Sequence, residues 1–159
     1  MKLKSLLISS FFWSSIIFAA PVDTGHAEVS IIKSEQPDNS GIVNLGIKMD
    51  MKPGWHTYWI NPGDSGGVID IEWTLPDGNE TSDVSYPSPH RIPYPPLMTF
   101  GYEDYVIFPL TLSLDNPNKD ISITAKIDFL ICADVCIPET ALIQTSLDSI
   151  KNDIELDEW

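Results

Sequence analysis

The sequence predicts an all-β fold, because apolar and polar residues alternate with a period of two along most of its length. Such alternation is typical of strands that bury one face. Groups rich in proline, glycine, asparagine and aspartate separate the alternating runs, and no stretch shows a convincing helical period. Short strands joined by regular turns predict an antiparallel β-sandwich, which we expect to be immunoglobulin-like.

Four runs show the alternation most clearly, and we expect strands at residues 43–51, 69–75, 106–114 and 121–129. Shorter runs predict further strands at residues 29–32, 55–60, 84–86 and 141–147. The turns expected between strands are residues 52–54, 61–64, 76–79 and 115–118.

Two segments do not fit the strand pattern. Residues 87–96 contain five prolines, which excludes a central strand and predicts an ordered loop or a polyproline stretch. Residues 151–159 form an acidic C-terminal tail, which we expect to fray.

The first 27 residues predict a secretory signal peptide. Lys2 and Lys4 give a positive start, and residues 6–20 are apolar apart from scattered serines. This apolar run is shorter than the roughly 20 residues that a spanning helix needs. We therefore expect cleavage after Ala27, where small residues stand one and three positions before the cut, and a periplasmic location for the product.

Cleavage after Ala20 is the alternative, and it is less favoured because Pro21 would follow the cut. With cleavage after Ala27, the remaining chain divides into one domain, residues 28–150, and the tail. A domain of this length can bury a core without disulfide staples.

The charge of the chain excludes some partners. The formal net charge is −14 at pH 7, so nucleic acid and anionic membrane surfaces are not expected to bind. Strong like charge favours a soluble, self-repelling protein, and we expect a monomer. The sequence has no phosphate-binding loop, and we expect no cofactor.

Chemistry is expected at the two cysteines, Cys132 and Cys136, which are separated by three residues. In an oxidising compartment two cysteines can pair. A straight strand would place their Cα atoms roughly 13 Å apart at about 3.3 Å per residue, whereas a disulfide needs about 7 Å or less. If the bond forms, residues 133–135 must therefore turn.

The residues leave three roles open for this pair: a reversible redox pair, a structural staple or part of a metal site. Closing so small a loop stabilises a fold by only about 2 kcal/mol, which makes the pair a weak staple. Strand parity makes Cys132 face away from the core, since Ile131 continues the inward series. Asp134 and Glu139 are close in sequence and disfavour a thiolate, so we expect exchange mainly inside docked complexes.

The metal alternative is a copper site. Both cysteines, with Met98 and His56, would suit the soft ion Cu(I). The sequence has no methionine-rich or histidine-rich run, and paired thiols tend to oxidise in the periplasm, so no metal is our leading prediction.

Four motifs follow one another along the chain: residues 54–59 (GWHTYW), 61–66 (NPGDSG), 72–76 (EWTLP) and 132–139 (CADVCIPE). Together they resemble the N-terminal periplasmic domain of DsbD-type thiol:disulfide interchange proteins, in particular the ScsB-like branch. The resemblance extends from Val29 to Leu147.

The resemblance implies an immunoglobulin-like domain that takes electrons from a membrane-embedded thiol reductase and reduces periplasmic thioredoxin-fold proteins. Such a domain is one component of a protein-disulfide reductase. Cys132 and Cys136 would then be the catalytic pair, with Cys136 facing the client. Phe100 and Met98 would cap the pair, while Tyr58 and Asp134 would stand beside it. The competing interpretation is a non-catalytic binding module whose disulfide is structural.

The chain also departs from the family. Well-studied members have five residues between the cysteines, and this chain has three. Acidic residues of their cap loop are replaced here by Met98 and Thr99. The membrane domain and the thioredoxin-like domain of the family are not in this sequence, which makes it either a stand-alone module or a fragment.

Overall fold

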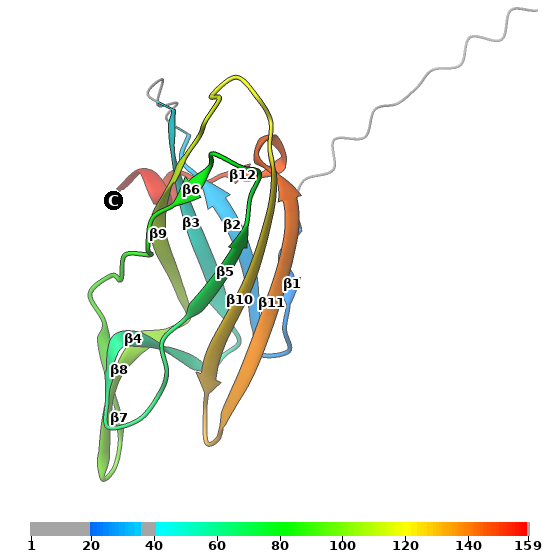
Figure 1. The fold of residues 1–159 in the computed structure, drawn as a ribbon. Coiled ribbons are helices and arrows are strands. Elements are labelled where there is room, and N and C mark those ends of the chain that lie inside the picture. Colours follow the sequence, from blue (N-terminus) through cyan, green and yellow to red (C-terminus); the bar gives the residue numbers. More distant parts are fainter. Residues whose placement is uncertain (1–19, 36–40, 159) are drawn as a thin grey trace, which may run out of the picture.

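Two β-sheets form the fold (Figure 1), which a computed structural model describes for residues 20–35 and 41–158. In this part of the chain the first sheet has the strand order β1 (Val22–Asp23), β2 (Ala27–Lys33), β3 (Ile42–Met51), β9 (Tyr105–Ser113) and β6 (Glu80–Thr81). A short strand, β12 (Lys151–Asn152), pairs with β2 in parallel.

The second sheet has the order β11 (Cys136–Ser146), β10 (Ser122–Cys132), β4 (His56–Gly63), β8 (Leu97–Glu103) and β7 (His90–Tyr94). The strand β5 (Asp70–Thr74) pairs with another part of β10. Two short 3-10 helices follow, η1 (Leu147–Ser149) and η2 (Ile154–Glu158). The all-β, immunoglobulin-like sandwich predicted from the sequence is confirmed. No helix in the described ranges has the length and apolar character needed to cross a membrane.

The core lies between the inner faces of the two sheets. Alternate residues of β3, such as Ile47 and Met49, are fully buried, as are Ala125 and Ile127 of β10. Burying each large apolar side chain stabilises the fold by about 1.5–3 kcal/mol. The period of two therefore determines which segments form strands and which face of each strand packs against the opposite sheet.

Three expectations about individual segments are corrected. Residues 90–94 of the proline-rich segment form β7, an edge strand of the second sheet. Proline is tolerated there because the outer side of an edge strand has no partner strand that needs its missing N–H. Residues 84–86 are not a regular strand, although the Ser85 amide donates to the carbonyl of Pro109 on β9. The turn expected at 61–64 begins later, because β4 continues to Gly63 after a register shift.

The acidic tail does not fray within the described residues. Leu156 is 4% exposed and packs with Ile32 and Ile107 in a small cluster on the outer face of the first sheet. Lys48 pairs with Asp153 and Glu155, so the acidic residues meet a cation. The tail therefore packs against the first sheet, because Leu156 buries its apolar side chain there and Lys48 offsets the charges of Asp153 and Glu155.

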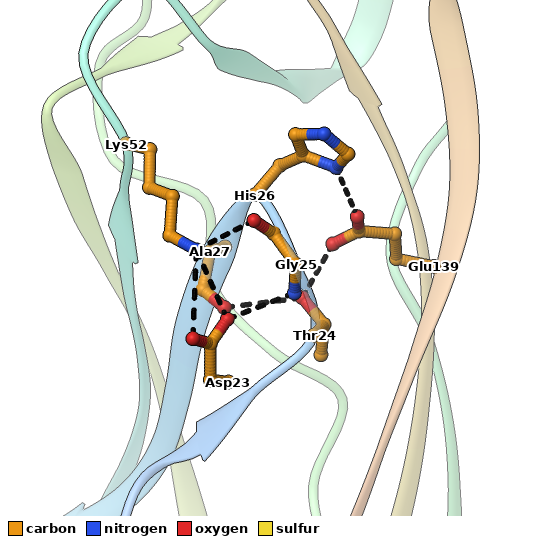
Figure 2. A network of polar contacts seen from close by, with 7 residues as sticks. All are labelled: Asp23, Thr24, Gly25, His26, Ala27, Lys52 and Glu139. Carbon is orange, nitrogen blue, oxygen red and sulfur yellow. Dashed lines mark hydrogen bonds and ion pairs between the residues drawn. The ribbon is translucent and has the colours of Figure 1, made fainter.

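The N-terminal segment also belongs to the sandwich (Figure 2). β1 pairs with β2, and Ala27 is fully buried. Thr24 and His26 both bond the carboxylate of Glu139, whose side chain is only 6% exposed, and Lys52 pairs with Asp23. The cleavage expected after Ala27 falls inside this structure and would remove β1 together with both partners of Glu139.

A protein that begins at Pro21 is therefore expected to be more stable than one that begins at Glu28. Leaving the buried Glu139 carboxylate without its partners costs about 1–3 kcal/mol, and the β1 contacts are lost as well. Urea unfolding of the two forms measures the difference. The change Glu139→Gln in the shorter form removes the buried, unpaired carboxylate charge. It is expected to recover part of the lost free energy of unfolding. Equal unfolding free energies for the two forms would show that the segment contributes nothing.

Candidate functional site

The two cysteines face each other at the end of the β10–β11 hairpin. Cys132 and Cys136 are paired in register, their sulfurs are 2.07 Å apart, and their Cα atoms are 4.1 Å apart. The amide of Ala133 donates to the carbonyl of Val135 over 3.0 Å and closes the turn. We call residues 132–136 the cysteine turn. The sharp turn that a disulfide at this spacing requires is therefore present.

The two sulfur-bearing residues differ in exposure. Cys132 is 1% exposed, whereas Cys136 lies on the surface. Cys132 is outside the main core cluster that contains Ile131, as strand parity predicts. It is nevertheless covered, because it lies between Cys136 on one side and His56 of β4 on the other. An incoming thiolate or disulfide therefore meets Cys136 first.

Tyr58 of β4 lies beside the exposed sulfur. Its hydroxyl is 3.5 Å from Sγ of Cys136 and 3.3 Å from Nε2 of His56, and its side chain is 2% exposed. Burial raises the pKa of Tyr58, and a hydrogen bond from Ser65 partly opposes this. The phenol therefore stays protonated at neutral pH and can donate a hydrogen bond to sulfur.

Residues 61–67, which include the NPGDSG motif, hold Tyr58 in place. Gly66 has φ +117° and lies against the tyrosine ring, so a Cβ there would be 2.3 Å from Cδ1 of Tyr58. Gly63 has φ +89° and lies so close to the Met98 carbonyl that a Cβ would be 2.5 Å from its oxygen. Only glycine satisfies both the positive φ and the contact. The motif thus forms one wall of the site.

A second hairpin lies at the same end of the sandwich as the cysteine turn (Figure 1). It consists of β7 and β8, residues 90–103, and we call it the cap hairpin. Asp64 fixes it, since the Met98 amide donates to Oδ2 of Asp64 over 2.8 Å and the Asp64 amide donates to the Met98 carbonyl over 3.1 Å. At its tip, the Tyr94 hydroxyl is 3.5 Å from the carbonyl oxygen of Asp134.

The structure places the candidate cap residues on this hairpin. Met98 is 37% exposed near its tip, and Phe100 is half-buried against Gly63. The Tyr94 hydroxyl of this hairpin lies 3.5 Å from the carbonyl oxygen of Asp134 in the cysteine turn, and the sequence did not single out Tyr94. Asp134 is exposed in the turn and takes part through its backbone carbonyl. The hydroxyl of Tyr58 lies beside Sγ of Cys136.

The two acidic residues near the cysteines do not act together. Glu139 lies on the inward face of β11, the opposite face from Cys136, and its carboxylate bonds Thr24 and His26 (Figure 2). Only Asp134 lies in the turn itself. The local charge that was expected to disfavour a thiolate is therefore smaller than the sequence spacing indicated. In the described ranges, no three His, Cys, Asp or Glu side chains are grouped as metal ligands.

Comparison with known proteins relates the chain to one family and to a solved domain. Residues 27–147 match the family described as thiol:disulfide interchange protein DsbD, N-terminal. The solved N-terminal periplasmic domain of ScsB from Proteus mirabilis has a similar fold, with a TM-score of 0.63 and 27% identity. That match covers 79% of this chain and 48% of the ScsB domain structure, so this chain spans about half of that structure. No curated protein matches the sequence.

Proposed function

Because the chain belongs to the DsbD N-terminal family of thiol:disulfide interchange domains, we propose that Cys132 and Cys136 relay electrons between two partners in the periplasm. The electron donor is a membrane-embedded thiol reductase, and the clients are periplasmic thioredoxin-fold proteins. The observation that carries the proposal is the asymmetry of the disulfide. Cys136 is exposed beside the buried Tyr58 and near the cap hairpin, which Asp64 holds by hydrogen bonds, whereas Cys132 is buried.

The exchange takes place in two half-reactions. A donor thiolate attacks Sγ of Cys136, the disulfide breaks, and a second donor thiolate resolves the mixed disulfide; the donor leaves as a disulfide and both cysteines become thiols. The Cys136 thiolate then attacks a client disulfide, and Cys132 attacks Sγ of Cys136 to release the client as a dithiol. Two electrons and two protons pass from donor to client in each cycle.

The competing possibility is an inert structural disulfide, and the reduction potential distinguishes the two. We expect the purified protein, equilibrated with a glutathione series and quenched with acid, to have a potential above about −300 mV. We also expect the reduced protein to reduce the disulfide of a purified periplasmic thioredoxin-fold protein. A lower potential, with no electron transfer to that protein, identifies a staple. The double variant with both cysteines changed to alanine is the control, and it should transfer nothing.

A further inference from the structure

A continuous line of polar atoms runs from an imidazole to the exposed sulfur. Nε2 of His56 is 3.3 Å from the Tyr58 hydroxyl, which is 3.5 Å from Sγ of Cys136. The imidazole and the phenol ring meet edge to face, with centroids 5.3 Å apart. The backbone pairing of His56 with Cys132 holds this arrangement in register with the cysteine turn. From the sequence, His56 was a candidate ligand of the alternative copper site, with no role in proton transfer.

We propose that His56 accepts and returns the proton of Cys136 through the hydroxyl of Tyr58. The inference rests on the proposed exchange at Cys132 and Cys136, and adds the group that moves the proton. His56 is a positioning and proton-handling residue, since it acts on sulfur only through Tyr58.

The proton transfer balances at each atom. In the dithiol state the Cys136 S–H donates to the Tyr58 oxygen, and the Tyr58 O–H donates to Nε2 of neutral His56. When the S–H bond breaks, its proton joins the Tyr58 oxygen while the original hydroxyl proton moves to Nε2. The products are a Cys136 thiolate and a His56 imidazolium, with Tyr58 still a neutral phenol that now donates to sulfur. The imidazolium stabilises the thiolate as an ion pair until the thiolate attacks the client, which lowers the pKa of the Cys136 thiol. His56 then releases its proton to solvent, and solvent protonates the thiolate that leaves the client.

The reverse transfer serves the other half-reaction. When the donor reduces the disulfide, Cys136 becomes a thiolate; His56 takes a proton from solvent on one side and passes a proton through Tyr58 to the sulfur on the other. A phenolic hydroxyl both donates and accepts, so the proton of Tyr58 can alternate between sulfur and nitrogen in the two states.

The surroundings of His56 match this role. Burial lowers the pKa of His56, and the Glu103 carboxylate, paired with it in register on β8, opposes the shift. The other titratable groups that face it are Tyr58 on its own strand and the cysteine pair on β10 and β11. A neutral imidazole near pH 7 can accept a proton, and the raised pKa of Tyr58 keeps that residue a relay rather than a phenolate.

The test measures the thiol of Cys136 directly in a Cys132→Ala background, where it is the only thiol. Alkylation by iodoacetamide is followed from pH 5 to pH 10, because the rate reports the thiolate fraction. Adding His56→Gln is expected to raise the thiol pKa and to slow alkylation at pH 7 by about tenfold, equivalent to one pKa unit. Adding Tyr58→Phe is expected to give a similar loss, and both changes together no more than either alone. The matched control is His90→Gln, an exposed histidine on β7.

The relay is refuted if the His56→Gln and Cys132→Ala protein alkylates at pH 7 within about twofold of the Cys132→Ala protein. It is also refuted if the losses from His56→Gln and Tyr58→Phe multiply, because independent effects add in free energy. Circular dichroism checks that each variant is folded, and Tyr58→Phe preserves the ring if His56→Gln does not fold. Failure of the relay leaves electron transfer by the unaltered protein intact, whereas failure of the proposed function abolishes that transfer whatever the alkylation rates are.

Discussion

Replacing Cys132 by alanine is expected to leave a protein that captures its client as a stable mixed disulfide, whereas replacing Cys136 is expected to abolish capture. The reason is exposure: Cys132 is 1% exposed behind His56, and Cys136 is on the surface beside Tyr58. In the Cys132→Ala protein the resolving thiol is missing, so the mixed disulfide persists. Incubation with an oxidised thioredoxin-fold protein, followed by a non-reducing gel, shows the trapped species.

A small aromatic disulfide reagent tests how accessible each sulfur is without any contribution from client recognition. Its reaction with the Cys136→Ala protein, where only Cys132 remains, should be slower by at least about tenfold than its reaction with the Cys132→Ala protein, because exchange requires in-line access to sulfur. Equal rates for the two variants would show that β4 does not shield Cys132. In that case the structural basis for assigning Cys136 as the client-facing sulfur would be lost.

The strands were the part of this fold that the sequence predicted best. The inward residues of β3 and β10 alternate without interruption, because each strand buries one face against the opposite sheet. The proline-rich segment and the acidic tail were harder to predict, since both depend on distant partners. β7 exists because β8 pairs with it, and η2 is held by Lys48 and by Leu156 packing on Ile32 and Ile107.

In the candidate site, too, local features were predicted from the sequence, whereas features that depend on distant partners were not. The cysteine spacing predicted the turn, and the resemblance indicated Tyr58. Tyr94 was not identified, and His56 was considered only as a copper ligand, because their places follow from long-range register and from the position of the cap hairpin. The acidic neighbours of the cysteines were misjudged for a related reason. Sequence spacing placed Glu139 near Cys136, but strand parity places it on the other face, where it bonds Thr24 and His26.

Changing Gly66 to alanine is expected to affect both stability and reactivity. The new Cβ would lie 2.3–2.7 Å from three carbons of the Tyr58 ring, and φ at Gly66 is +117°. The backbone strain costs about 1–3 kcal/mol, and overpacking against the ring costs a similar amount. Urea unfolding should therefore show a loss of about 2–6 kcal/mol in the free energy of unfolding. In the protein that remains folded, the displaced ring separates Tyr58 from Cys136, and thiol alkylation should slow as it does for Tyr58→Phe.

Substitutions at two other glycines distinguish backbone strain from the contact with the Tyr58 ring. Gly54 has φ +84° with open space around a Cβ, so Gly54→Ala measures the backbone strain alone. Gly67 is the neighbour of Gly66, and a Cβ there would meet Leu130 at an ordinary 3.7 Å, so Gly67→Ala should be nearly neutral. If Gly66→Ala destabilises no more than Gly54→Ala, the ring contact contributes nothing. If Cys136 then also reacts at its normal rate, Tyr58 is not held by the 61–67 segment, and the motif must be explained by its contacts with the cap hairpin instead.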